Sequence, residues 1–298
     1  MTLPNFLVIG AGRSGTTSLH HYLGQHPDVY LCPEKSPNFF VSHEPLPPWE
    51  GPTVRRMAEH WVRDRRTYEA LFDGIQDEWA IGEVSPVYLQ ALGAAPAIRK
   101  LCPDARLVAV LRQPVDRAYA HFLGRRRDGL DSRRTFREVV DDERSRPLPD
   151  AVAFGSYLGC GRYHHFLGPY YELFPRDRIR VYLFEDLLTD AAGLLSDLFA
   201  FLGVDPEFAP STAKRHAETG VIENPVLRAV WTGSVRARTA LRPHLPAGVR
   251  DLGRGIFARR LAKEALEPGL RAELVEVFRD DIGKLQGLIG RELGHWLA

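Results

Sequence analysis

The strongest indication of the fold is the stretch Phe6-Leu7-Val8-Ile9-Gly10-Ala11-Gly12-Arg13-Ser14-Gly15-Thr16-Thr17-Ser18-Leu19. Its apolar start is followed by a loop with three glycines, and then by a segment in which Leu19, Tyr22 and Leu23 recur at helical spacing. This order predicts a strand, a turn and a helix. Glycines let the backbone approach an anion closely, and the first amides of a helix have no internal partners. The stretch therefore predicts a phosphate-binding loop, with a purely steric glycine-rich turn as the alternative.

The loop departs from the P-loop of nucleoside-triphosphate enzymes at one position. Gly10, Gly15 and Thr17 fit the pattern in which two glycines flank four residues and a Lys-Ser/Thr pair follows. The lysine position of that pattern, however, is Thr16. A loop that lacks this lysine is poorly equipped to hold the β and γ phosphates of a triphosphate. The basic side chain of the loop is instead Arg13.

A second apolar run, 107–111, is typical of a buried parallel strand, and Arg112 follows it. A Walker-B strand ends in aspartate, so Arg112 argues against a magnesium-nucleotide enzyme such as a P-loop kinase. The alternation of strand and helix continues to residue 203 and predicts an α/β fold with a mainly parallel central sheet flanked by helices. Strands are predicted at 6–9, 29–31, 107–111 and 179–184, and a further strand begins at 79–81. Helical patterns cover 53–73, 86–101, 114–126, part of 125–150, 155–174, 191–202 and 268–296.

Composition is that of an ordinary globular protein. The 298 residues are 44% hydrophobic and 26% charged, which predicts one large domain over 1–298. The net charge of +1 gives no general case for nucleic acid or membranes as partners. The window 225–263 nevertheless holds nine basic residues against one acid, Asp251, so it forms either a face for an anionic ligand or a solvated helix pair.

The cysteines and the chain start give no sign of secretion. Cys32, Cys102 and Cys160 are an odd number, widely spaced and without a CxxC pair, so neither a disulfide framework nor a metal site is expected. No cationic leader and no apolar run close to ~18 residues is visible. We therefore expect a cytoplasmic protein without a transmembrane segment.

Several ordered motifs resemble one enzyme family. They are Arg-Ser-Gly-Thr-Thr-Ser-Leu at 13–19, His-Pro-Asp-Val at 26–29, Glu-Lys-Ser-Pro-Asn-Phe-Phe at 34–40, Gly-Glu at 82–83 with Ser-Pro-Val-Tyr-Leu at 85–89, Leu-Arg-Gln-Pro-Val-Asp-Arg-Ala-Tyr at 111–119, and Gly-Arg-Tyr at 161–163. Together they resemble the sulfotransferases that use 3′-phosphoadenosine-5′-phosphosulfate (PAPS), most of all the bacterial, heparan-sulfate and tyrosylprotein branches. The resemblance spans nearly the whole chain.

This resemblance implies a binding site for PAPS and for its product, adenosine 3′,5′-bisphosphate (PAP), without a metal. Arg112 is expected to grip the 3′-phosphate, with Arg162 and Tyr163 approaching the same phosphate or the adenine, although Tyr163 can equally be a core residue. Arg13 matches the position where related enzymes place a catalytic lysine or arginine against charge on the bridging oxygen. The 5′-phosphate is expected to bind the loop residues Gly12, Arg13, Ser14, Gly15, Thr16, Thr17 and Ser18.

Two positions depart from the family pattern. A serine usually follows the Arg-Ala-Tyr step, but here that position is Ala120, so one 3′-phosphate contact is missing or comes from another residue. The glutamate that usually precedes the Phe-Phe pair by three residues is Ser36, which cannot accept a proton at neutral pH. The base is therefore expected to be Glu34, which lands on the position of the base in the tyrosylprotein branch, or Glu83.

The leading hypothesis is a PAPS-dependent sulfotransferase that acts on a hydroxyl or amine of a small-molecule or glycan acceptor. A carbohydrate or glycosylated metabolite, a lipid and a protein tyrosine are all compatible with the sequence. Because Ser36 and Ala120 depart from the family pattern, a PAP-binding protein without transferase activity is an alternative. A P-loop kinase is the less favoured alternative.

Overall fold

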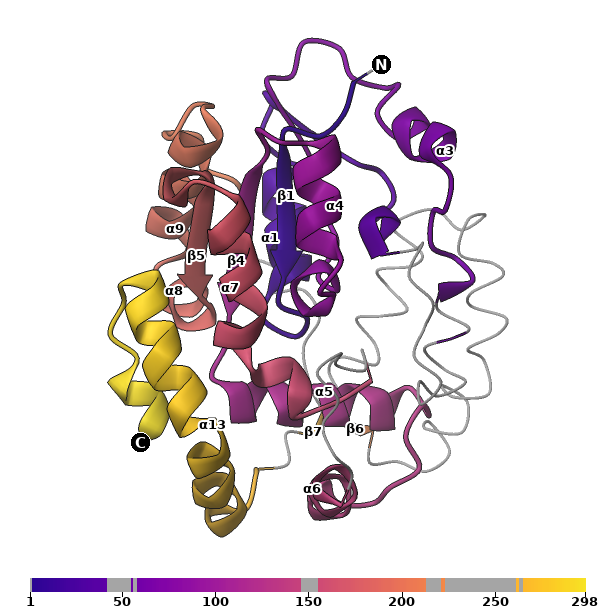
Figure 1. Cartoon of the computed structure of the whole chain (residues 1–298). Coiled ribbons are helices and arrows are strands. Elements are labelled where there is room, and N and C mark those ends of the chain that lie inside the picture. Colours follow the sequence, from indigo (N-terminus) through magenta and orange to yellow (C-terminus); the bar gives the residue numbers. More distant parts are fainter. Residues whose placement is uncertain are drawn as a thin grey trace.

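A computed structural model of the chain describes residues 2–41, 55, 58–145, 155–212, 221–222, 261–262 and 265–298. Its main sheet has five strands in the order β2-β3-β1-β4-β5, and every neighbouring pair runs parallel, which confirms the predicted α/β class (Figure 1). The strands are β1 (Phe6–Gly10), β2 (Val29–Leu31), β3 (Ala80–Val84), β4 (Arg106–Leu111) and β5 (Ile179–Leu183), and a separate antiparallel pair is formed by β6 (Val221–Ile222) and β7 (Leu261–Ala262).

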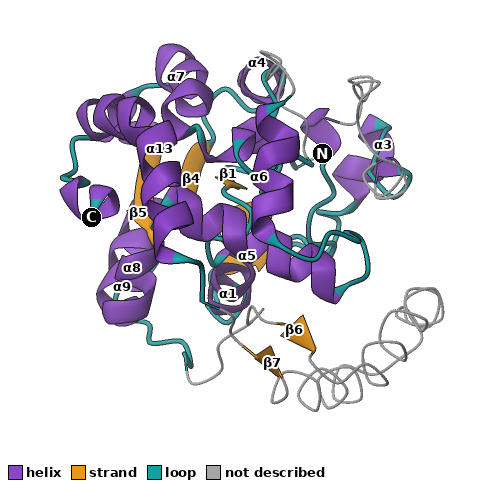
Figure 2. Ribbon diagram, turned by 90° about the horizontal axis from the view of Figure 1, so that it is seen from below, coloured by secondary structure: helices purple, strands orange, loops and turns teal. Residues whose placement is uncertain are grey.

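Helices cover both faces of the main sheet because successive side chains of each buried strand point to opposite sides. Phe6 and Val8 of β1 pack with one set of helices, and Leu7 and Ile9 pack with the other. The two layers lie on either side of the strands in Figure 2. The first layer contains α1 (Thr16–Leu23) and α9 (Ala191–Leu202), and the second contains α4 (Ala94–Leu101), α7 (Tyr163–Leu173) and α13 (Pro268–Ile289).

Helix α5 (Pro114–Arg127) crosses the sheet at the carboxyl ends of the strands (Figure 1). Helix α6 (Phe136–Arg144) follows it, as the pattern of Phe136, Val139 and Val140 predicts, and α8 (Phe184–Thr189) follows β5 directly. The strand order places β3 on one side of β1 and β4 on the other. The connection that leaves β1 therefore leads to one side of the sheet, towards β2, and the connection that leaves β4 leads to the other, towards β5. In open parallel sheets such a switch point forms the crevice where ligands bind.

Four predicted helices are shorter than the sequence pattern suggests, and the last of them, predicted over 268–296, ends at Ile289. In 86–101, the 3₁₀ turn η2 (Tyr88–Gln90) is separate from α4, because Ala91 between them has an extended backbone with φ −97° and ψ 111°. In 155–174, the 3₁₀ turn η3 (Gly159–Gly161) is separate from α7, because Arg162 between them has a non-helical ψ of 73°. In 53–73, the described residues contain α3 (Arg65–Ala70), which begins at Asp64 because that side chain accepts a hydrogen bond from the Thr67 amide at 2.8 Å.

The carboxyl-terminal segment packs against α5 and α7, as its apolar periodicity predicts. Helix α13 buries Leu270, Leu274, Phe278, Ile282 and Leu285, and it ends at Gly290, which has a left-handed φ of 65°. The 3₁₀ turns η1 (Phe39–Val41), η4 (Arg176–Arg178) and η6 (Gly294–Leu297) complete the described elements. The proline-rich segment 43–52 and most of the basic window 225–263 lie outside the described residues. Every helix in the described part is too short or too polar to cross a bilayer.

Candidate active site

The loop between β1 and α1 presents its backbone at the switch point. The Ala11 amide donates to the Val110 carbonyl of β4 at 2.8 Å, which ties the loop to the neighbouring strand. Arg13 and Gly15 have left-handed φ values of 73° and 90°, and no side chain caps the start of α1. A Cβ on Gly12 would meet no heavy atom within 4 Å, so the loop has open space there. Uncapped amides beside open space suit a phosphate group, as the sequence predicts.

Arg112 stands next to this loop at the carboxyl end of β4. Its Nη1 donates to the Arg13 carbonyl at 3.4 Å, and its guanidinium carbon lies 4.8 Å from the centroid of the Phe184 ring. Burial lowers the pKa of Arg112, whereas the charge of Asp116 raises it. A half-buried guanidinium next to a phosphate loop is suited to bind a second phosphate group.

The other predicted cofactor residues, Arg162 and Tyr163, lie at the start of α7. Tyr163 is fully buried, and its hydroxyl donates to the Arg112 carbonyl at 2.9 Å. This hydrogen bond holds the Arg112 backbone in place. Arg162 is exposed at the start of α7, where its charge acts on Asp281 of α13.

Arg13 extends from the loop onto α5. A Cβ added to Gly124 would lie 2.7 Å from the guanidinium carbon of Arg13, so the guanidinium packs directly on the glycine. Burial lowers the pKa of Arg13, and so do the nearby charges of Arg127 and Arg117, while Asp128 raises it. The Arg13 side chain is therefore held within a group of positive charges at the end of the sheet.

Arg117 and Arg125 of α5 add to this positively charged group, and His121 lies among them. Arg117 is 2% exposed, and its Nη2 donates to the Tyr157 carbonyl. Burial lowers the pKa of His121 well below its usual value, and the charges of Arg117 and Arg13 lower it further, so His121 is neutral at pH ~7. Arg117 Nε, His121 Nδ1 and Arg125 Nε are buried without a hydrogen-bond partner in the described structure. Buried cations with unsatisfied donors favour a bound anion, because an anion offsets their desolvation.

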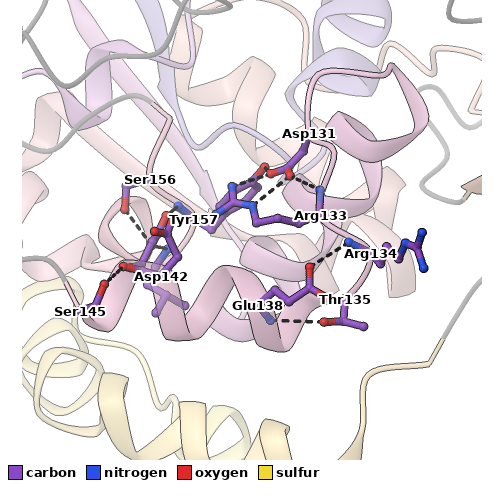
Figure 3. Close-up of polar contacts among 11 residues, drawn as sticks. Asp131, Arg133, Arg134, Thr135, Glu138, Asp142, Ser145, Ser156 and Tyr157 are labelled. Carbon is purple, nitrogen blue, oxygen red and sulfur yellow. Dashed lines mark hydrogen bonds and ion pairs between the residues drawn. The ribbon is translucent and has the colours of Figure 1, made fainter.

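A network of hydrogen bonds holds the segment beneath these arginines. The Tyr157 hydroxyl donates to Asp131 at 2.5 Å, and Asp131 forms an ion pair with Arg133 at 2.6 Å (Figure 3). The carboxylate of Glu143 accepts the amides of Tyr157 at 2.6 Å and Leu158 at 2.8 Å. This network fixes the Tyr157 carbonyl and ring against α5, and thereby the arginines that contact them.

The loop that follows β2 reaches the start of α1. Lys35 Nζ donates to Thr17 Oγ1 at 3.2 Å, and Glu34 is exposed next to it in sequence. The Ser36 amide donates to the Val84 carbonyl at 3.1 Å, which ties this loop to the end of β3. Lys35 belongs to the motif that carries the family resemblance, but its proximity to Thr17 depends on the tertiary fold.

Glu83 lies beneath that loop and has no exposed surface. Its carboxylate accepts hydrogen bonds from the hydroxyls of Tyr68 at 2.8 Å, Tyr88 at 2.8 Å and Ser85 at 3.0 Å. Burial raises the pKa of Glu83 to about 7, although the three hydroxyl donors lower it. Glu83 thus has a pKa suited to proton transfer, but its oxygens face the protein interior.

The structure therefore brings residues 12–18, Arg112 and Lys35 together, and Glu34 precedes Lys35 on the loop after β2. Glu83 lies in the interior, and Arg162 is exposed at the start of α7. Among the described residues no three His, Cys, Asp or Glu side chains are grouped as metal ligands. A parallel α/β sheet with a phosphate loop and an arginine at its switch point defines a protein that binds a phosphate-bearing nucleotide.

Within this class of nucleotide-binding proteins, the chain matches one family. Residues 4–209 match the model of the sulfotransferase family, and the chain belongs to this family, whose members use PAPS. The crystal structure of a sulfotransferase from Alicyclobacillus acidocaldarius matches all of this chain and all of that protein, with 31% identity and a TM-score of 0.77. This similarity confirms the predicted family and fold.

Curated relatives match over shorter shares of their length. The human bifunctional heparan sulfate N-deacetylase/N-sulfotransferase 2 is 25% identical over 206 residues, which are 68% of this chain and 22% of that protein. The membrane-associated sulfotransferase kil1 of Dictyostelium discoideum is 29% identical over 122 residues, which are 41% of this chain and 23% of that protein. The chain thus spans less than a quarter of the length of these relatives.

Proposed function

We propose that this chain transfers the sulfuryl group of PAPS to a hydroxyl or amine of an acceptor and releases PAP. The observation that carries the proposal is the pairing of an uncapped phosphate loop with Arg112 across the β1–β4 switch point. In the reaction the acceptor oxygen or nitrogen bonds to sulfur, the bond between sulfur and the 5′-phosphate oxygen breaks, and the acceptor proton passes to a base.

The residues that would hold PAPS are those that the sequence predicts. Residues 12–18 bind the 5′-phosphate at the start of α1 through the hydroxyls of Thr16 and Thr17 and through backbone amides other than that of Ser14, which donates to the Ala11 carbonyl at 3.3 Å. Arg112 binds the 3′-phosphate, and Tyr163 holds the Arg112 carbonyl in place. Arg162 would have to approach the nucleotide from the exposed start of α7.

Arg13 stabilises the negative charge that develops on the leaving oxygen. Its guanidinium is already fixed against Gly124, so little reorganisation is needed when that charge appears. One such contact is worth ~3 kcal/mol of transition-state stabilisation, or a few hundredfold in rate. The neighbouring charges of Arg127 and Arg117 add to the positive potential at this point.

Glu34 takes the acceptor proton. It is exposed on the loop whose next residue, Lys35, contacts Thr17 of α1, so its carboxylate is open to an acceptor near the phosphate loop. Glu83 has a raised pKa, but its oxygens are occupied by the hydroxyls of Tyr68, Tyr88 and Ser85. Direct proton transfer to Glu83 would require these side chains to move.

The acceptor class that we favour is a carbohydrate or a glycosylated metabolite. The support is the similarity to proteins whose names describe heparan sulfate N-sulfotransferases, together with the hydrogen-bonding arginines of α5 near the phosphate loop. Hydroxyl and amine groups of sugars are the nucleophiles that such a site would use.

The test is a transfer assay with labelled PAPS in buffer that contains EDTA. The purified chain is incubated with oligosaccharides that carry free hydroxyls or amines, with tyrosine peptides and with simple phenols. We expect label in a saccharide product and an equal amount of PAP. If PAP binds but no acceptor in the panel becomes labelled, a PAP-binding protein without transferase activity becomes the better description.

A further inference from the structure

The phosphate loop lacks a lysine at the position where P-loops carry one, and the one cation within the loop, Arg13, packs against α5. Thr16 occupies that position, and the guanidinium of Arg13 packs on Gly124 of α5. A cation nevertheless reaches the start of α1 from another segment. Lys35, from the loop after β2, donates from Nζ to Thr17 Oγ1 at 3.2 Å.

The backbone around Lys35 is held in an unusual conformation. Ser36 and Asn38 have left-handed φ values of 67° and 55°, which costs a non-glycine residue ~1–2 kcal/mol. The loop is retained because the Asn38 amide donates to Ser85 Oγ at 3.3 Å and the Val62 amide donates to the Pro37 carbonyl at 2.9 Å. Strained backbone that its surroundings fix in this way tends to occur at ligand sites.

Lys35 is the cation that the loop after β2 brings to the start of α1. Burial and, next, the charge of Lys35 lower the pKa of His20 to about 4, so His20 is neutral at pH ~7. The uncapped start of α1 already favours an anion through its amides and dipole. Thr17 accepts the Lys35 hydrogen bond through its oxygen, which leaves its own hydroxyl proton to be donated to a phosphate oxygen.

We propose that Lys35 is a further cofactor-binding residue that contacts the 5′-phosphate end of PAPS, in place of the lysine that a P-loop carries within the loop. This inference rests on the proposed function, because it needs PAPS at the 12–18 loop. Lys35 acts together with Thr17, so the two loops form one anion site. The ligand group that it recognises is the 5′-phosphate, not the 3′-phosphate that Arg112 binds.

Calorimetric titration with two ligands tests this assignment. PAP carries both phosphates, and adenosine 3′-phosphate lacks the one that Lys35 would contact. Lys35→Met removes the charge while keeping an unbranched side chain, Lys35→Arg keeps the charge, and Lys100→Met is the matched control at an exposed lysine in the last turn of α4. Far-UV circular dichroism and the Tm establish that each variant is folded.

We expect Lys35→Met to raise the Kd for PAP by about 10- to 100-fold and to change the Kd for adenosine 3′-phosphate by less than about twofold. Lys35→Arg should recover most of the PAP affinity, and Lys100→Met should bind as the parent does. Equal weakening of both ligands by Lys35→Met would mean that Lys35 only supports the loop, and unchanged PAP binding would place it outside the site. If the parent chain itself binds no PAP, the proposed function fails, and this inference fails with it.

Discussion

At the scale of single residues, Glu83 is the carboxyl group with the most unusual environment in the site region. Burial raises its pKa from 4.5 to about 7, so the folded chain keeps the proton over a pH range in which the unfolded chain loses it. The contribution of Glu83 to stability is therefore present below pH 4.5, falls as the pH rises to about 7, and is constant above that value.

Replacing Glu83 by glutamine removes this titration. We predict that the free energy of unfolding of the parent, minus that of Glu83→Gln, falls by about 2–3 kcal/mol between about pH 5 and about pH 8. Urea unfolding at several pH values measures the difference. A difference that does not change with pH would show that Glu83 has an ordinary pKa in the folded chain.

Turnover distinguishes Glu34 from Glu83 as the base. Glu34→Gln keeps the size and hydrogen-bonding capacity of the side chain but removes its basicity, so with a hydroxyl acceptor we predict that kcat falls by roughly 10² to 10⁴. PAP affinity should stay nearly unchanged, and Glu83→Gln should reduce kcat much less. Steady-state kinetics with the acceptor from the transfer assay measure both variants. If Glu83→Gln abolishes turnover while Glu34→Gln retains it, the base is the buried carboxylate.

The sequence could predict those site residues that belong to a continuous motif. The glycines and hydroxyls of residues 12–18 and Arg112 at a strand end are recognisable because a strand and its following loop are local features. The contact of Lys35 with Thr17, and the packing of Arg13 on Gly124, join segments that only the parallel sheet brings together. No local pattern in the sequence encodes such distances.

At the scale of elements, α5 supports the site through a helical glycine. Alanine at Gly124 should favour the helix by up to about 1 kcal/mol, because glycine has a low helix propensity. The added Cβ would, however, occupy a point 2.7 Å from the guanidinium of Arg13 and displace it. We predict that Gly124→Ala leaves the Tm unchanged or higher while kcat falls by at least about tenfold.

Gly283→Ala in α13 is the control for this experiment. A Cβ at Gly283 would meet no heavy atom within 4 Å, so this variant should gain stability without any loss of turnover. Thermal unfolding and initial-rate kinetics on both variants test the comparison. Full activity in a stable Gly124→Ala variant would mean that the position of Arg13 on α5 has no role in catalysis.

The lengths of elements were harder to predict than their types. The apolar runs of β1 and β4 are unambiguous because both faces of these strands are buried. The predicted helix 86–101 was too long, because Tyr88 and Leu89 are buried by tertiary packing in a 3₁₀ turn and not by a continuous helical face. Apolar spacing indicates which residues are buried, whereas the extended backbone of Ala91 separates the turn from the regular helix.

At the scale of the whole molecule, the strand order is what assembles the site. Because β3 and β4 lie on opposite sides of β1, the loop after β1 and Arg112 after β4 meet at one edge of the sheet. The carboxyl-terminal segment supports the same edge, since Gln113 Nε2 donates to the Trp296 carbonyl at 3.1 Å. We propose that residues 1–298 form one domain organised around this edge.

Calorimetric titration of PAP in the presence of EDTA shows whether the phosphate loop and Arg112, at the carboxyl ends of the strands, bind PAP without a metal. We predict binding of one PAP per chain, no requirement for magnesium, and little binding of ATP with magnesium. Arg112→Ala should fold and should weaken PAP binding by ~1.5 to 3 kcal/mol, because it removes a charge-assisted contact with a phosphate. A parent chain that binds ATP with magnesium but not PAP, or a folded Arg112→Ala variant that binds PAP as tightly as the parent, would show that this end of the sheet is not a PAP site.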